Sequence, residues 1–174
     1  MEPIAYQQYV DATKNVVVKE TGLHIKSITT SDDDDHHSNP ILLGASPDGI
    51  VKERRSGKDS DDDHEYSYGL LEIKCLYGQR TKKKLKQYEY CPKRFYDQIQ
   101  GQLAVCSADD FNVEWCDLIV WIPRNSKAKD QNYSIVRVYK NETYWNEKLL
   151  PEIKNFVTDV QTNVRNNKEK GEPK

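Results

Sequence analysis

The stretch YGLLEIKCL, residues 68–76, decides the architecture that the rest of the chain completes. Its residues alternate as those of a β-strand do, so that Glu72 and Lys74 project from the same face. The other positions are almost all apolar, which predicts a strand with both faces covered. A carboxylate and an ammonium on a covered strand need polar partners. Such pairs also occur on many exposed strands, so this one favours a functional site only if other polar groups converge on it.

The turn SPDGI, residues 46–50, supplies the first such group. Its proline and glycine bend the chain between two predicted strands. If the second of these pairs with the central strand as a hairpin, Asp48 meets Glu72. The two carboxylates and the backbone carbonyl of Ile73 then form an oxygen-rich cage of the kind that Mg²⁺ or Mn²⁺ prefers, and Lys74 beside it helps to deprotonate a water. The alternative is that Asp48 only shapes the turn.

Hydrophobic periodicity predicts an α/β fold, a central mixed β-sheet flanked by α-helices. We expect a single domain over residues 1–174, with flexible polar loops at 31–39 and 54–67 and a frayed tail from about 167. The expected elements are a helix at 2–14, strands at 21–28, 41–45, 49–53 and 68–76, a helix at 92–106, strands at 112–123 and 132–139, and a helix at 143–167.

Two glutamines lie on the apolar stripe of the helix expected at 92–106. Gln98 and Gln102 share this stripe with Phe95, Ile99 and Leu103, so at least one glutamine should point toward the sheet. A buried glutamine with satisfied hydrogen bonds is one interpretation. The other is a side chain that orients a water or a nucleic-acid phosphate.

The composition limits the class of protein. A chain of 174 residues with 31% charged residues has room for one compact core and long polar loops. Its four cysteines form no C-x-x-C pair, which indicates reduced thiols and an intracellular protein of the cytoplasm or nucleus. No apolar run is long enough to cross a membrane. P-loop, GxGxxG and GxSxG motifs are absent, so nucleotide-driven and triad chemistries are unsupported.

Charge is distributed unevenly along the chain. The tract SDDDDHH, residues 31–37, could bind a transition metal but is more typical of a solvated loop. A basic stretch between residues 79 and 94 either forms a solvated surface or contacts phosphates. Its basic residues are Arg80, Lys82, Lys83, Lys84, Lys86, Lys93 and Arg94.

Four motifs in this order carry a resemblance to a known family: GASPDGIV, GLLEIKC, FYDQIQGQLAV and WCDLIVWIP. The chain resembles the PD-(D/E)xK nucleases of the YqaJ viral recombinase group, which is related to bacteriophage lambda exonuclease and the herpesvirus alkaline nuclease. The resemblance runs from Glu2 to about Pro123. It implies a restriction-endonuclease-like core and hydrolysis of DNA phosphodiester bonds with one or two Mg²⁺ or Mn²⁺ ions.

The resemblance also implies residue roles. Asp48 and Glu72 match the metal-binding carboxylates, with the Ile73 carbonyl, and Lys74 matches the catalytic lysine. Gln98 matches a glutamine close to that lysine and the scissile phosphate. Glu2 resembles the acidic residue of the first core helix that reaches a second metal, although it could simply cap the helix. Nucleic-acid contacts are expected from Ser46 and the basic residues named above.

The chain departs from the family in two places. The helices that carry groups for the DNA 5′ end have no counterpart upstream of Met1, so we expect a catalytic-core fragment or a minimal relative. The spacing from Asp48 to Glu72 is lengthened by an acidic insertion. Exonuclease and endonuclease action therefore both stay open, on double-stranded ends or on branched or single-stranded DNA. The alternatives are an RNA endonuclease and a non-catalytic nucleic-acid-binding module. Each of these functions is compatible with a single-strand annealing or replication partner and with an oligomer.

Overall fold

The computed structural model describes residues 2–14, 16–29, 40–55, 66–76, 88–107, 112–122 and 132–170. Its elements, in chain order, are α1 Glu2–Ala12, β1 Val16–Lys19, β2 His24–Ile28, β3 Ile41–Ala45, β4 Gly49–Arg54, β5 Tyr66–Cys75, α3 Lys93–Cys106, β6 Trp115–Trp121, β7 Tyr133–Tyr139, α4 Glu142–Tyr144, a π-helical turn Trp145–Leu149 and α5 Leu150–Lys170. The loop predicted at 31–39 lies outside the described residues.

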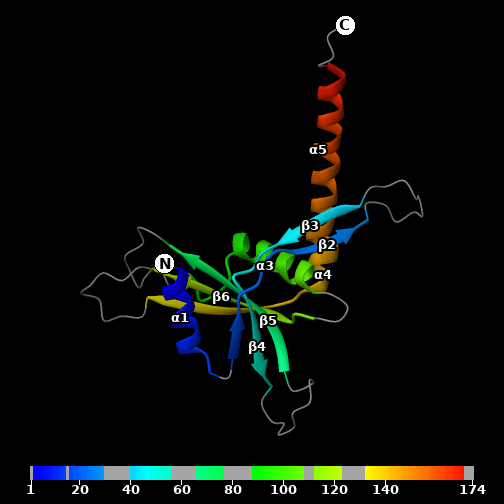
Figure 1. Cartoon of the computed structure of the whole chain (residues 1–174). Coiled ribbons are helices and arrows are strands. Elements are labelled where there is room, and N and C mark those ends of the chain that lie inside the picture. Colours follow the sequence, from blue (N-terminus) through cyan, green and yellow to red (C-terminus); the bar gives the residue numbers. More distant parts are fainter. Residues whose placement is uncertain are drawn as a thin grey trace.

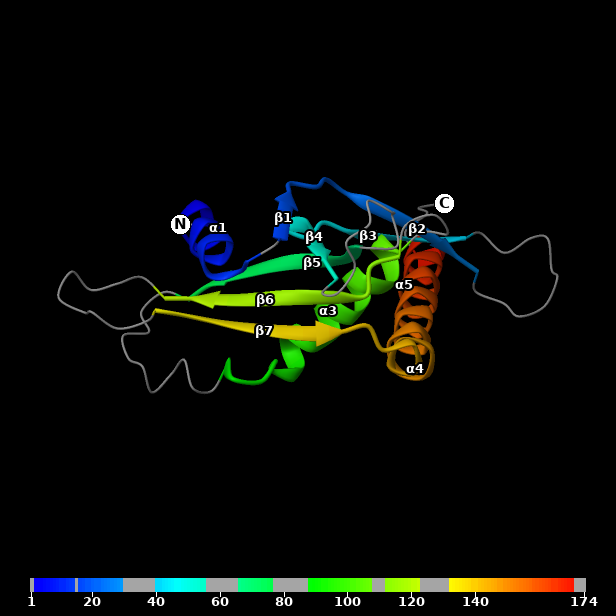
Figure 2. The ribbon, with the colours of Figure 1, turned by 90° about the horizontal axis from the view of Figure 1, so that it is seen from below.

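The five-stranded sheet has the order β1-β4-β5-β6-β7, and β5, the strand that bears Glu72 and Lys74, lies at its centre. Among these strands β5 and β6 pair in parallel, whereas β1–β4, β4–β5 and β6–β7 are antiparallel. A parallel pair needs a crossover connection, and α3 supplies it. Figures 1 and 2 show β5, β6 and β7 side by side. The α/β fold with a mixed central sheet is therefore confirmed.

Both faces of β5 are covered, as its apolar positions predict. Leu70 packs with Ile99 and Leu103 of α3 in one buried cluster. Leu71 and Ile73 pack with α1 in a second cluster on the opposite face. Glu72 and Lys74 share the parity of Leu70, so they project toward α3.

Helix α3 has a second neighbour besides the sheet. Strands β2 and β3 form a separate antiparallel hairpin that packs against it. The Lys26 ammonium of β2 donates a 2.9 Å hydrogen bond to the Ala104 carbonyl of α3. The helix is thus held between the main sheet and this hairpin, with Gln98 and Gln102 directed at Glu72 of β5.

The structure corrects three boundaries. Strand β1 was not predicted; it forms because Val16–Lys19 pair with β4. Strands β4 and β5 extend into the loop predicted at 54–67, where Lys52 lies 3.7 Å from the centre of the Tyr66 ring. The remaining insertion, 56–65, lies outside the described residues. Helix α5 continues past residue 167, where fraying was predicted, because after Pro151 in its first turn no glycine or proline follows before Gly171.

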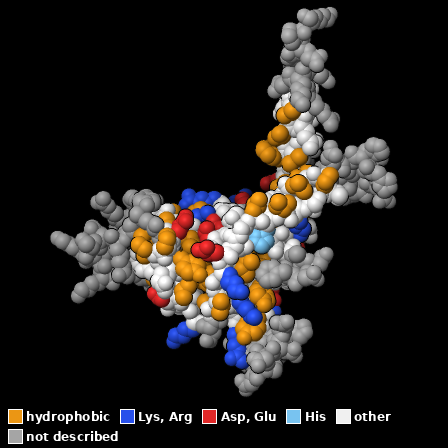
Figure 3. All heavy atoms as spheres, viewed as in Figure 1, with side chains coloured by type: hydrophobic (Ala, Val, Ile, Leu, Met, Phe, Trp, Pro, Cys, Tyr) orange, Lys and Arg blue, Asp and Glu red, His pale blue; other side chains and the backbone are white. Residues whose placement is uncertain are grey.

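The C-terminal helix leaves the body of the molecule as a long rod (Figure 1). Pro151 has no N–H, and the Leu150 N–H bonds to the Trp145 carbonyl five residues earlier, so a π-helical turn joins α4 to α5. Figure 3 shows hydrophobic side chains along the visible side of the rod. Phe156 and Val160 of α5 are exposed. No helix in the described part of the chain is long and apolar enough to span a membrane.

Candidate active site

The turn before β4 holds Asp48 against the edge of β5. The Asp48 N–H donates to the Leu71 carbonyl at 3.0 Å, and the Ile73 N–H donates to Asp48 Oδ2 at 2.6 Å. The hairpin expected from the sequence therefore forms, and it brings Asp48 beside the strand that carries Glu72. Gly49 permits the close approach of β1, since a Cβ there would lie 2.9 Å from Val18 Cγ1.

Glu72 is a buried carboxylate, 5% exposed, with three side-chain donors. Its Oε1 accepts hydrogen bonds from Lys74 Nζ at 2.5 Å and from Gln98 Nε2 at 2.8 Å. Its Oε2 accepts from Gln102 Nε2 at 2.8 Å. The ammonium and two amides offset the desolvation of this carboxylate.

The two glutamines come from successive turns of α3, so they lie on one face of that helix. Gln98 is exposed, whereas Gln102 is buried. The sequence pattern predicted that at least one glutamine points toward the sheet, and the structure places both on Glu72. The contact of Gln102 was not predicted, because nothing local indicates which strand residue lies opposite it.

Burial, and then two neighbouring carboxylates, oppose the ionisation of Asp48. Burial raises the pKa of the Asp48 carboxyl, and the hydrogen bond from the Ile73 N–H lowers it. Glu72 and Glu2 raise the pKa further, while Lys74 lowers it. A partly desolvated carboxylate beside two others attracts a cation.

Glu2, in the first turn of α1, reaches the same cavity as Asp48. This cavity has a volume of about 560 Å³, and Ser46 and Ile73 also line it. Glu20 lines it too and was not singled out from the sequence. Its position follows from the unpredicted strand β1, whose pairing ends with Lys19 opposite Ile50.

The structure describes only part of the predicted nucleic-acid surface. Ser46, Lys93 and Arg94 are exposed. The Arg94 guanidinium lies 4.6 Å from the centre of the Phe95 ring and donates to the Tyr88 hydroxyl at 3.2 Å. The other predicted basic contacts lie outside the described residues: Arg80, Lys82, Lys83, Lys84 and Lys86.

The cysteines have structural roles. All four are free. Cys75, directly after Lys74, packs against the α1-side cluster, and burial raises the pKa of its thiol. Burial also raises the pKa of Cys91 and Cys106 to about 11. These thiols stay protonated at neutral pH, which argues against a nucleophilic cysteine.

Comparisons with known proteins identify the family and the fold. The family described as the YqaJ-like viral recombinase domain matches residues 1–109. No curated protein matches the chain. Among solved structures, the alkaline exonuclease LHK-Exo from Laribacter hongkongensis is similar, with a TM-score of 0.65 and 24% identity over 97% of this chain and 69% of that one.

The structure of LHK-Exo in complex with dAMP is also similar, with a TM-score of 0.65 and 22% identity over the same shares of the two chains. At this identity the likeness shows the fold, which is restriction-endonuclease-like. The match over residues 1–109 shows the family. The chain therefore belongs to the YqaJ-like viral recombinase family.

Proposed function

We propose that the protein hydrolyses DNA phosphodiester bonds in a reaction that depends on Mg²⁺ or Mn²⁺, as a nuclease of DNA recombination or processing. One observation carries this proposal: the Asp48 carboxylate is fixed on the Ile73 N–H, beside the buried Glu72 and its partner Lys74. The same set would cut RNA, but membership in a viral recombinase family favours DNA.

The donors at this site fit a hard divalent cation. Asp48 and Glu72 offer carboxylate oxygens. The N–H and C=O of one strand residue point to the same edge, so the Ile73 carbonyl faces the side on which its N–H meets Asp48. No group of three or more His, Cys, Asp or Glu side chains is arranged to hold a metal within the described ranges. The Ile73 carbonyl and water would therefore complete the coordination, as Mg²⁺ commonly requires.

A bound Mg²⁺ would polarise the phosphate oxygens and lower the pKa of water. Glu2 is the candidate for a second ion, since it lines the cavity of Asp48. The buried Gln102 holds Glu72 Oε2, whereas the donors on Oε1 are the more exposed Lys74 and Gln98. Glu72 would therefore help to hold the ion while Gln102 keeps its carboxylate in place.

The chain's own residues would then act on the substrate. Lys74 and Gln98, whose donors now meet Glu72, would donate to a phosphate that enters the site. The neutral amine of Lys74 would accept a proton from the attacking water, and the ammonium that results would offset the charge that develops on the phosphoryl oxygens. As the water oxygen bonds to phosphorus, the P–O3′ bond would break, and the leaving 3′ oxygen would take a proton from solvent.

The test incubates the protein with linear DNA, closed circular DNA and RNA in Mg²⁺, in Mn²⁺ and in EDTA. We expect cleavage of DNA that EDTA abolishes and that Asp48→Ala and Lys74→Ala each remove. Cleavage that survives in both variants would overturn the mechanism. Cutting of closed circles would identify an endonuclease, and products from linear DNA alone would identify an exonuclease.

A further inference from the structure

Helix α1 carries Glu2, the candidate ligand of a second ion, and its attachment to the sheet decides where Glu2 lies. Among the described side chains of α1, Ala5 and Tyr9 are buried. Both pack in one cluster with Leu71 of β5. Because apolar packing is not directional, it does not by itself fix the tilt of a helix. The tilt of α1 therefore depends on its polar contacts.

Tyr9 makes a directional contact within this buried interface. Its hydroxyl donates to Asp117 Oδ2 of β6 at 2.8 Å, and Asp117 is 2% exposed. Burial and the Asp117 carboxylate raise the pKa of the Tyr9 hydroxyl, so it stays protonated and donates. A hydrogen bond to a charged acceptor is stronger than one between neutral groups. This bond therefore fixes the point at which α1 meets the sheet.

Other hydrogen bonds of α1 to its surroundings lie closer to solvent. The Tyr6 hydroxyl donates to the Val18 carbonyl at 3.3 Å, and the Trp121 indole N–H donates to Gln8 Oε1 at 2.5 Å. Both bonds are only partly buried, so water can replace either partner at small cost. The Tyr9 bond is buried, and water cannot replace it.

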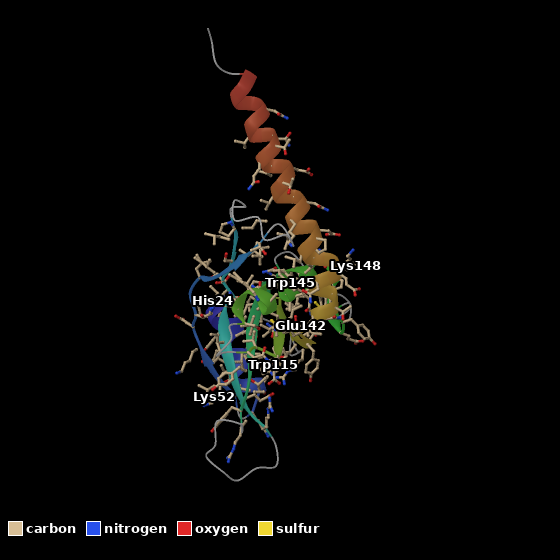
Figure 4. All side chains as sticks on the ribbon, turned by 90° about the vertical axis from the view of Figure 1, so that its right-hand side faces the viewer. His24, Lys52, Trp115, Glu142, Trp145 and Lys148 are labelled. Carbon is tan, nitrogen blue, oxygen red and sulfur yellow. The ribbon has the colours of Figure 1, made fainter. Side chains whose placement is uncertain are left out.

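The acceptor of this bond is itself held across three strands. Arg137 of β7 donates Nε to Asp117 Oδ1 at 2.8 Å and Nη2 to Oδ2 at 2.9 Å. The same guanidinium donates Nη1 to Glu53 Oε2 of β4 at 2.6 Å and lies 3.6 Å from the centre of the Trp115 ring. Figure 4 shows Trp115 in the body of the molecule, away from α5. A bidentate arginine leaves the Asp117 carboxylate one orientation, so Tyr9 is bound to a fixed point.

Glu2 and Tyr9 lie on one face of α1, two turns apart. Seven residues at a rise of about 1.5 Å each separate them by about 10 Å along the helix axis. Glu2 lines the cavity of Asp48, and its charge raises the pKa of that carboxyl. A rotation of α1 by about 6° around its Tyr9 end would move Glu2 by about 1 Å, a displacement that can cost a reaction about 10²-fold in rate.

We propose that Tyr9 is a positioning residue, whose hydrogen bond to Asp117 sets the tilt of α1 and thereby holds Glu2 where a second divalent cation would bind. The proposal rests on the proposed metal-dependent nuclease and adds to it a residue outside the site. Tyr9 is fully buried and is not among the described residues that line the cavity of Asp48. It therefore acts through Glu2 and not on the substrate.

Calorimetric titration with Mn²⁺ in the absence of DNA tests this role in the wild type, Tyr9→Phe, Glu2→Gln and the double variant. Phenylalanine keeps the buried ring, and Asp117 Oδ2 still accepts from Arg137, so we expect Tyr9→Phe to fold. Its Mn²⁺ affinity should fall roughly threefold to tenfold, because the ion must then orient α1 without one hydrogen bond. In the Glu2→Gln background the same substitution should change Mn²⁺ affinity by less than about twofold.

Tyr144→Phe is the matched control, since it removes a tyrosine hydroxyl that donates to another aspartate, Asp97, at 2.6 Å. It should leave Mn²⁺ affinity unchanged. Hydrogen exchange of the α1 amides, followed by mass spectrometry without metal, should be faster in Tyr9→Phe and unchanged in Tyr144→Phe. Mn²⁺ affinity that is unchanged in Tyr9→Phe, or that falls equally with Glu2 and with Gln at position 2, would overturn the proposal.

DNA cleavage is measured separately on the same preparations, so that the two proposals can fail independently. If Mn²⁺ binding couples Tyr9 to Glu2 but the wild type cleaves no DNA, the proposed nuclease is refuted and the positioning role stands. If cleavage depends on Asp48 and Lys74 but Mn²⁺ binding shows no such coupling, the positioning role is refuted and the nuclease stands.

Discussion

Two substitutions of Glu72 should separate its role in the fold from its role in catalysis. Glu72 accepts hydrogen bonds from Lys74, Gln98 and Gln102. Lys74 and Gln98 can turn to water if the carboxylate is removed, since the Lys74 side chain is 25% exposed and Gln98 is exposed. Gln102 is buried and cannot. The loss in folding stability therefore depends on whether the buried Gln102 amide keeps a hydrogen-bond partner.

In Glu72→Ala the Gln102 amide loses its acceptor and the side-chain volume becomes a cavity. An unsatisfied buried donor costs about 1–3 kcal/mol and a truncated buried side chain adds to it, so we expect a loss of about 2–4 kcal/mol. In Glu72→Gln the new amide can donate to Gln102 Oε1 if Gln102 reverses, because that oxygen receives no hydrogen bond from the described residues of the wild-type protein. We expect this variant to lose about 1 kcal/mol or less.

Urea unfolding followed by circular dichroism measures both losses, and the DNA cleavage assay is run on the same preparations. We expect Glu72→Gln to keep a midpoint near that of the wild type and to lose cleavage by about 10³-fold or more, because an amide replaces a carboxylate ligand. The reasoning fails if the two variants are equally stable. It also fails if Glu72→Gln is the less stable of the two.

Three further predictions concern neighbouring residues. Lys74→Met keeps the aliphatic stem and should lower kcat by about 10²–10⁴-fold with little change in stability, measured by single-turnover cleavage; a smaller loss would exclude proton transfer by Lys74. Burial raises the folded-state pKa of Asp48, so its ionisation lowers the stability of the wild type as pH rises from the unfolded-state pKa through the folded-state pKa. Asp48→Asn should therefore gain stability relative to the wild type between about pH 3 and pH 7, measured by urea unfolding at each pH. A relative loss would contradict the cause assigned to the pKa shift. A Cβ on Gly69 would lie 2.3 Å from a ring carbon of Trp115, so Gly69→Ala should lower stability by about 1–3 kcal/mol, whereas Gly22→Ala, with nothing within 4 Å, should not.

Local sequence signals were sufficient for the central strand, the turn and the crossover helix. The alternation at residues 68–76 assigned Glu72 and Lys74 to one face, and the structure confirms it. The proline and glycine around Asp48 predicted a bend, and the apolar stripe at 92–106 predicted α3. These signals are local because helix and strand periods are set by the backbone within a few residues.

Other features depend on segments far apart in the chain. Four residues are too few to indicate a strand by periodicity, so β1 exists only through its pairing with β4, and Glu20 reaches the Asp48 cavity only through β1. The sequence by itself determined which residues share a face of β5 and of α3. Only the packing of α3 on β5 decided that Gln102 meets Glu72, because a hydrogen bond across 30 residues requires both backbones in place.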